Sequence, residues 1–161
     1  MTEARIIPIE ELPSLLQPEA RLLGLDLGTK TIGMALSDVT RSVATPLRTL
    51  KRAKFTADAE TIAEVVAMNQ VGAVVIGLPL NLDGTEGPRA QSTRAFARNL
   101  APHIDAPIVF WDERLSTAAV ERHLIEADAS RKRRAEVIDR MAAAYILQGA
   151  LERLRTLRQT K

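Results

Sequence analysis

Residues 21–37 have the sequence RLLGLDLGTKTIGMALS, and this stretch decides the fold. Residues 21–27 form an apolar run that predicts a buried strand, and residues 31–37 predict a second strand. The three residues between them, 28–30, include Gly28 and are few enough for a hairpin turn. The two strands are therefore expected to be antiparallel neighbours. A carboxylate, Asp26, lies near the end of the first strand.

The segments around this hairpin predict the other elements. Residues 42–50 are expected to form a third antiparallel strand, at an edge of the sheet because Pro46 cannot donate to a ladder. Short apolar runs predict strands at 73–76 and 107–111, buried on both faces as in parallel sheets. Helical periodicity predicts helices at 58–69, 89–100, 117–126 and about 135–157. Gly72 is expected to stop the first of these helices, which places Ile62, Val65, Val66 and Met68 on or near one face. In the second helix, the side chains expected to face inward are Ala95, Phe96 and Leu100.

This order of elements predicts an α/β fold. A three-strand antiparallel meander followed by parallel strands gives a mixed five-stranded sheet with helices on both faces. Residues 1–20 contain Pro8, Pro13 and Pro18, so we expect an N-terminal arm there with at most a turn of helix. Residues 21–161 are expected to form a single domain.

Composition narrows the function classes. The chain has no cysteine, which excludes disulfides, zinc–thiolate sites and thiol chemistry. Lys and Arg number 22 against 20 Asp and Glu, for a formal net charge of +2, and four consecutive cationic residues occupy positions 131–134. Such a run is either a solvated loop or a contact for a polyanion. No segment reaches the roughly 18 apolar residues of a membrane span, so we expect a soluble, cytoplasmic protein with no membrane partner.

Three acidic residues are embedded in apolar sequence rather than in a charged face. Asp26 follows Leu25, Glu113 follows the apolar strand 108–111, and Asp139 lies in a largely apolar part of the last helix. Each has an ordinary alternative, because Asp26 could anchor the turn and the other two could form surface ion pairs. If the three converge, their repulsion must be neutralised, and hard oxygen ligands favour Mg²⁺ or Mn²⁺. Two such ions would suit hydrolysis of a phosphodiester.

Candidate substrate contacts lie close to these acids in the sequence. The loop 79–84 could contact a phosphate or sugar through its backbone amides and side chain 81, or be an ordinary turn. The residues proposed to bind substrate are Lys30, Asn81, Arg114, Arg133 and Arg134.

Four segments in this order resemble the YqgF family, also called RuvX-type. They are residues 24–33 (GLDLGTKTIG), 77–79 (GLP) with Asn81, Asp83 and Gly84, 112–117 (DERLST), and 137–143 (VIDRMAA). The resemblance spans about residues 21–155. It implies a ribonuclease H-like fold with Asp26, Glu113 and Asp139 as catalytic and metal-binding acids.

The resemblance implies a metal-dependent endonuclease. Family members are described as nucleases that mature the 5′ end of pre-16S ribosomal RNA and as Holliday junction resolvases, so the nucleic-acid partner is structured RNA or branched DNA. The protein is expected to be a monomer or a homodimer, and a four-way junction would suit a two-fold dimer.

Two other classes of protein compete with the nuclease interpretation. Residues 26–29 also resemble the first phosphate loop of actin- and sugar-kinase-like ATP-binding proteins, although those duplicate the fold. A catalytically silent nucleic-acid binder would gain nothing from carboxylates beside a phosphate backbone.

Overall fold

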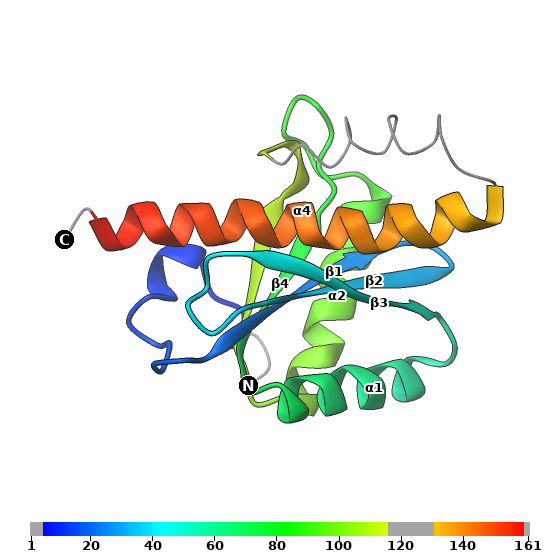
Figure 1. Cartoon of the computed structure of the whole chain (residues 1–161). Coiled ribbons are helices and arrows are strands. Elements are labelled where there is room, and N and C mark those ends of the chain that lie inside the picture. The colour runs from blue at the N-terminus through cyan, green and yellow to red at the C-terminus, as the bar shows by residue number, and fades with distance from the viewer. Residues whose placement is uncertain (1–4, 116–130, 160–161) are drawn as a thin grey trace.

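The computed structural model describes residues 5–115 and 131–159, and for residues 131–140 it describes the course of the helix without the side chains. Its centre is a five-stranded sheet with the strand order β3-β2-β1-β4-β5 (Figure 1). The strands are β1 (Arg21–Leu27), β2 (Thr31–Ser37), β3 (Ala44–Lys51), β4 (Val71–Leu78) and β5 (Ile108–Asp112).

Strand pairing confirms the predicted mixed sheet. β1 pairs antiparallel with β2, and β2 pairs antiparallel with β3, so the first three strands form a meander. β1 and β4 are parallel, as are β4 and β5. β3 lies at the edge of the sheet, where Pro46 follows a shift in the register with β2. An edge position beside such an irregularity suits a residue that has no amide hydrogen to donate.

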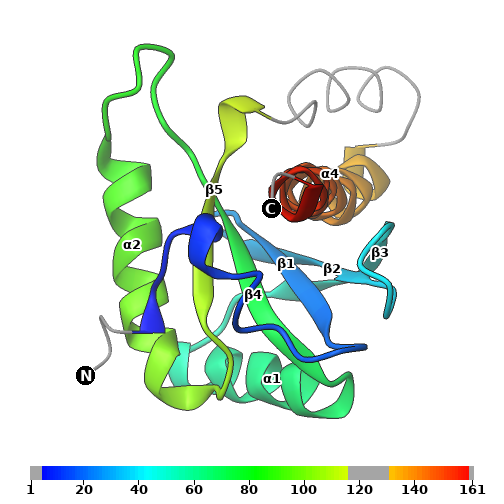
Figure 2. The same ribbon diagram turned by 90° about the vertical axis from the view of Figure 1, so that its left-hand side faces the viewer.

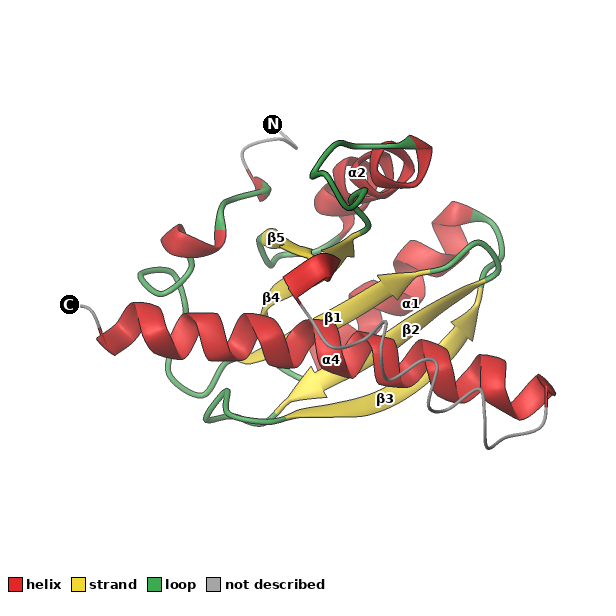
Figure 3. Ribbon diagram, turned by 90° about the horizontal axis from the view of Figure 1, so that it is seen from above, coloured by secondary structure: helices red, strands yellow, loops and turns green. Residues whose placement is uncertain are grey.

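Helices cover both faces of the sheet. Figures 2 and 3 show α4 (Arg131–Gln159) crossing one face, while α1 (Phe55–Met68) and α2 (Pro88–Leu100) lie on the other. Three short 3-10 turns complete the described part: η2 (Ile9–Glu11), η3 (Ala101–His103) and η4 (Glu113–Leu115). The helix predicted at 117–126 falls outside the described residues. Among the described helices, none combines the length and the apolar composition needed to cross a membrane.

Alternation along the strands divides the buried side chains between two cores. The core under α1 and α2 takes one set of positions, including Leu23, Leu25, Leu27, Ile76 and Ile108. The core under α4 takes the intervening set, including Leu22, Val75, Val109, Ile146 and Leu147. Because successive strand residues point to opposite faces, the face of each polar residue on a strand follows from its apolar neighbours.

The described part of the N-terminal segment packs against the domain. Leu12 is fully buried in the core under α4. Farther upstream, the backbone N–H of Ile7 donates to the carbonyl of Ile108, at 2.9 Å. The guanidinium of Arg5 donates to the carbonyl of Ala101, at 3.0 Å. These contacts fasten residues 5–12 to β5 and to the turn that precedes it.

Three details of the predicted elements were wrong. α1 begins at Phe55, three residues before the predicted start. Gly72 does not stop this helix but lies within β4, where an added Cβ would meet the Cβ of Ala20 at 2.8 Å. The left-handed residue after the helix is Gln70, with a φ of 53°. Met68 was expected on or near the same face as Ile62, Val65 and Val66 but is 83% exposed, at the last residue of the helix.

Candidate active site

The carboxyl ends of β1, β4 and β5 lie together, because these three strands are parallel. Below, this row of strand ends is called the edge of the sheet. In open α/β sheets this edge is where ligands bind. The two acidic residues predicted from the strands, Asp26 and Glu113, are both at this edge. The loop between β4 and α2, residues 79–87, leaves the sheet at the same place.

Asp26 faces α4. Its neighbours Leu25 and Leu27 belong to the core under α1 and α2, so residue 26 takes the opposite face. The adjacent position on that face, Gly24, confirms this, because a Cβ added there would lie 2.8 Å from the Cβ of Leu147 in α4. Asp26 is 4% exposed. A carboxylate buried to this degree needs its charge balanced by hydrogen bonds or by cations.

Glu113 reaches the same face from β5. It begins the η4 turn directly after the strand, and it continues the alternation of Val109 and Trp111, which face α4. A Cβ added to Gly77 in β4 would lie 2.7 Å from Oε1 of Glu113 and 2.5 Å from Cδ1 of Ile146. The side chain of Glu113 therefore lies over Gly77, between the sheet and α4.

Strand register brings the two acids toward each other across β4. Leu25 pairs with Ile76, so Asp26 and Gly77 are the next residues of two adjacent strands. The Glu113 carboxylate lies over Gly77, on the face that Asp26 also takes. Gly77 thus leaves the space for Glu113, a role that was not predicted from the sequence, although Gly77 lies in the segment 77–79 that carries the family resemblance. The sequence did show a glycine near the end of the apolar strand VGAVVIGL. The reason for a glycine there is that Glu113 and Ile146, from distant segments, occupy the space above it, and a local pattern does not reveal this.

The third predicted acid, Asp139, lies in the first part of α4, whose side chains are outside the described structure. Its place along the helix is known. Ala143, four residues later, lies over β1, where its carbonyl oxygen is 3.0 Å from the Cβ position of Gly24. Arg133 and Arg134 precede Asp139 in the same helix, and their side chains are likewise outside the described part.

Arg114 joins the η4 turn to the loop after β4. Its Nε and Nη2 donate to the carboxylate of Asp112, at 3.1 and 2.7 Å, and its Nη1 donates to the carbonyl of Leu82, at 3.1 Å. This guanidinium holds the pKa of the Asp112 carboxyl below its usual range, and the carboxylate in turn raises the pKa of Arg114. The contacts show Arg114 positioning the loop, and its predicted contact with substrate stays a prediction.

The loop itself is braced from within. The backbone N–H of Asn81 donates to the carbonyl of Thr85, and its side-chain Nδ2 donates to the Thr85 hydroxyl, both at 2.9 Å. That hydroxyl donates to Asp83 at 2.6 Å, which lowers the pKa of the Asp83 carboxyl. Gly84 takes a φ of 89°, a left-handed conformation that glycine adopts without strain. Asn81 is exposed at this loop, and Lys30 is exposed in the turn after β1.

The donor set suits a hard divalent cation. Asp26 and Glu113 supply carboxylate oxygens on one face of one sheet edge, the ligand type that Mg²⁺ and Mn²⁺ favour. Among the residues with described side chains, no group of three His, Cys, Asp or Glu is close enough to hold a metal ion. A third protein carboxylate would have to come from the part of the chain whose side chains are not described, and Asp139 is in that part.

Comparison with known proteins extends these observations. A relative from Methylocella silvestris, named "Putative pre-16S rRNA nuclease", is 58% identical over 154 residues, or 96% of each chain. A relative from Roseobacter denitrificans with the same name is 67% identical over 139 residues, or 85% of each chain.

Solved structures share the fold at low sequence identity. RuvC of T. thermophilus in complex with a Holliday junction substrate has a TM-score of 0.54 at 14% identity, covering 85% of this chain and 97% of its own. The yeast mitochondrial Holliday junction resolvase Ydc2 has a TM-score of 0.53 at 11% identity, covering 92% of this chain and 84% of its own. The predicted ribonuclease H-like fold is therefore confirmed.

The sequence profile described as "RuvX: Holliday junction resolvase" matches residues 20–153. This range contains β1 to β5 and all three predicted acids. Together with relatives that are 58% and 67% identical along most of their length, it shows that the chain belongs to the RuvX family.

Proposed function

We propose that this protein is a metal-dependent endonuclease that hydrolyses phosphodiester bonds in the 5′-end maturation of pre-16S ribosomal RNA in the cytoplasm. The observation that carries the proposal is the position of Glu113 over Gly77, on the face and at the sheet edge where Asp26 is buried. Two carboxylates on one face of one sheet edge repel each other, and a bound divalent cation would offset that repulsion. The names of the relatives give the proposed substrate.

Asp26, Glu113 and Asp139 are proposed to hold Mg²⁺ or Mn²⁺. Asp139 is the third ligand because it precedes Ala143, which lies over Gly24, by about one turn of α4. Two bound ions would supply an activated water and stabilise the leaving oxygen of the phosphodiester. Gly77 leaves the space that Glu113 occupies, and Arg114 fixes the loop beside it. Lys30, Asn81, Arg114, Arg133 and Arg134 are the proposed substrate contacts.

A second candidate substrate is a four-way DNA junction, because the family profile is described as that of a Holliday junction resolvase. RNA and DNA offer the same phosphodiester to the same carboxylates, so the site itself does not rank them. The deciding experiment compares cleavage of a precursor 16S rRNA fragment and of a four-way DNA junction by the purified protein. Cleavage of the RNA at the mature 5′ end, with the junction intact, is the expected result. The same samples give the oligomeric state, monomer or homodimer.

The metal requirement has its own test. Cleavage is expected with Mg²⁺ or Mn²⁺ and is expected to be weak with Ca²⁺, whose longer bonds and looser geometry misplace the ligands. Excess EDTA should abolish it. Full cleavage in EDTA would refute the metal assignment whichever substrate is used.

Replacing Asp26 with Asn tests the carboxylate assignment. Asp26→Asn preserves shape and removes one ligand charge, so cleavage should fall by several orders of magnitude. The melting temperature should hold or rise, because repulsion among the acids is relieved. Asp105→Asn is the matched control, since Asp105 is exposed and precedes β5 at the opposite edge of the sheet. Wild-type cleavage by Asp26→Asn would refute the assignment.

A further inference from the structure

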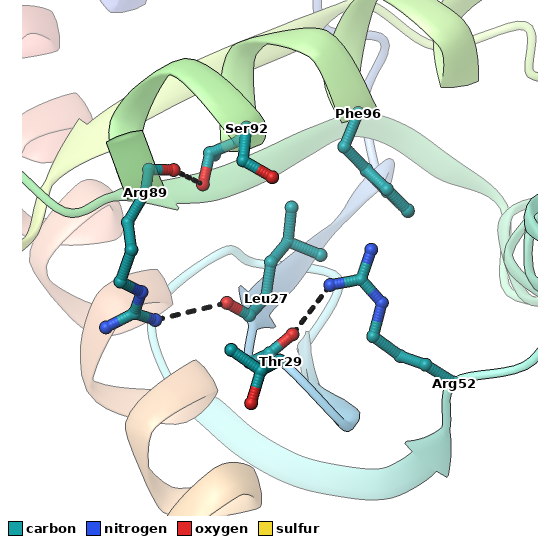
Figure 4. Close-up of a pocket in the computed structure, with 8 residues that line it drawn as sticks. Leu27, Thr29, Arg52, Arg89, Ser92 and Phe96 are labelled. Atoms are coloured by element: carbon teal, nitrogen blue, oxygen red, sulfur yellow. Dashed lines mark hydrogen bonds between the residues drawn. The ribbon is translucent and has the colours of Figure 1, made fainter. Parts of the chain in front are cut away.

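A second polar feature lies on the other face of the same strand end. It is a hollow of about 350 Å³, counted with its open mouth, between the turn after β1 and the first turns of α2. Figure 4 shows its walls, formed by Leu27, Thr29, Arg52, Arg89, Ser92 and Phe96. Leu27 and Thr29 belong to the segment 24–33 that carries the family resemblance, whereas Arg52, Arg89 and Ser92 were not singled out in the sequence as part of a site. We call this hollow the Arg52–Arg89 cleft.

The cleft is cationic. Two of the residues that line it are arginines and none is acidic. The ion pairs of the described side chains join Arg94 to Glu86 and Arg114 to Asp112, so neither involves the arginines of the cleft. The two charges therefore face a polar hollow without a described carboxylate to balance them.

Each arginine uses one N–H donor of its guanidinium in a hydrogen bond to a backbone carbonyl and keeps the other donors for a ligand. Nη1 of Arg52 donates to the carbonyl of Gly28 at 2.6 Å, and Nη2 of Arg89 donates to the carbonyl of Leu27 at 3.4 Å. The Arg52 guanidinium also lies over the Phe96 ring, 5.4 Å from its centre, at a distance typical of a cation–π contact. A guanidinium has five N–H donors, so these anchors leave others for an oxyanion.

The start of α2 adds positive potential to the same wall. Gly87, the residue before the helix, makes no side-chain cap, and the first turn of α2 contains no acidic residue. The partial positive charge of this end is therefore not offset by a capping side chain. The hydroxyl-bearing Ser92 lies one turn into the helix, on the wall of the cleft. This contribution reinforces the two arginines, which remain the principal charges.

The cleft and the carboxylates flank one strand end. Asp26 faces α4, whereas Leu27, the next residue, lines the cleft on the α2 side. The turn 28–30, called the ridge below, follows this strand end; its Gly28 and Thr29 line the cleft and its Lys30 is exposed. A nucleic-acid strand that crosses this ridge would bring one phosphodiester to the carboxylates and another phosphate to the arginines.

We propose that the Arg52–Arg89 cleft binds a phosphate group of the polynucleotide, away from the bond that is cut. The inference rests on the proposed nuclease function, and it assigns a phosphate-binding site to residues of β1, the turn after it, the segment after β3 and α2. The cleft fixes the register of the strand by a contact that does not depend on base sequence. A free phosphate or nucleoside monophosphate shares this chemistry, and the experiment separates the two sources.

The experiment is a salt titration of binding in Ca²⁺, which keeps cleavage low. The probes are a fluorescent single-stranded RNA and a four-way DNA junction, and the main variant is Arg89→Gln. Arg89 is exposed and its one described side-chain bond is long, so the variant should fold like the wild type. Loss of one phosphate contact should flatten the slope of log K against log salt by about 0.7 for the single strand and about 0.9 for the duplex arms.

Two further variants complete the design. Arg98→Gln is the matched control, because Arg98 is exposed in the last turn of the same helix and its loss changes the net charge equally. Arg52→Gln should flatten the slope by a similar amount. Because Arg52 also donates to the Gly28 carbonyl, the melting temperature of this variant is measured to distinguish loss of a phosphate contact from destabilisation of the turn. Equal slopes for Arg89→Gln, Arg98→Gln and the wild type would overturn the proposal.

The free-ligand arm uses orthophosphate and adenosine monophosphate in place of the polynucleotide. Binding of either compound at the cleft is detected by shifts of the Ser92 and Thr93 amide signals. If a small ligand binds there and Arg89→Gln leaves the polynucleotide slope unchanged, the cleft is a small-ligand site and the proposed contact with the polynucleotide backbone is overturned. Binding is measured without turnover, so this inference can fail while Asp26-dependent cleavage stands. Equally, absent cleavage would refute the proposed nuclease function without altering the slopes.

Discussion

Asp26 and Leu27 are adjacent in the sequence but face opposite sides of the sheet, because β1 alternates its side chains between two faces. Asp26 stood out in the sequence because an acid in an apolar strand is unusual, and the structure confirms that it is buried in β1, while its catalytic role stays a prediction. Arg52 and Arg89 were not predictable, because each lies in an ordinary polar segment. Their pairing depends on the segment after β3 and the start of α2 meeting at the turn after β1, which no local pattern specifies.

Gly77 gives a prediction at the scale of one methyl group. In Gly77→Ala the new Cβ would meet the ends of Ile146 and Glu113 at 2.5 and 2.7 Å. Both are flexible tips, so stability should fall by only about 1 kcal/mol. The displaced Glu113 carboxylate should lower cleavage by about 100-fold, the cost of an error of about 1 Å in a reacting geometry.

Urea unfolding and single-turnover cleavage measure the two effects of Gly77→Ala separately. Gly87→Ala is the control, since its added Cβ would approach the Asn81 side chain at an ordinary 3.6 Å. Comparable activity in the two variants would show that Glu113 does not act from its position over Gly77.

At the scale of elements, the sequence predicted the existence and order of the five strands. Four of them, β1, β2, β4 and β5, are short apolar runs between turn residues, whereas β3 is mostly exposed. The prediction failed at the junction of α1 and β4, where Gly72 indicated a helix stop. The backbone reverses instead at Gln70, and Gly72 is small because Ala20 packs against it. That contact joins segments 52 residues apart, so a pattern of neighbours could not reveal it.

The Asp112–Arg114 pair connects two elements, β5 and the loop after β4, and this gives a prediction about pH. Because the pKa of Asp112 is lower in the folded protein than in the unfolded chain, the pair stabilises the fold above the unfolded value of about 4. This contribution is lost as the pH falls through the lower, folded pKa. Asp112→Asn should therefore be less stable than the wild type at pH 7, and the difference should shrink below about pH 4.

Hydrogen exchange locates this effect. Loss of the carboxylate frees Arg114 from its anchor, so amides of residues 80–85 should exchange faster in Asp112→Asn at pH 7 while those of β1 and β4 are unchanged. Glu86→Gln is the control, because it removes the Arg94 pair at the other end of the same loop. Unaltered exchange in the loop would show that its internal bonds, and not Arg114, hold it.

At the scale of the molecule, the sheet separates two cationic regions that a single nucleic-acid strand could contact. One is the Arg52–Arg89 cleft on the α2 side, and the other is the run 131–134 at the start of α4, on the opposite face. The formal net charge is only +2, so binding depends on where these charges lie more than on their sum.

The sequence places Arg133 and Arg134 a few residues before Asp139, and we predict that both contact phosphates. The double variant Arg133→Gln/Arg134→Gln should flatten the slope of log K against log salt by about 1.4 to 1.8 and weaken all sequences alike. Combined with Arg89→Gln, the changes in slope should add, because contacts on opposite faces of the sheet share no partner. Arg153→Gln/Arg155→Gln is the charge-matched control, exposed near the far end of α4. A slope equal to that of this control would make residues 133 and 134 a solvated face. If the combined change in slope is smaller than the sum of the separate changes, the two regions bind the strand in alternative paths. A single strand would then not cross residues 28–30 to contact both regions at once.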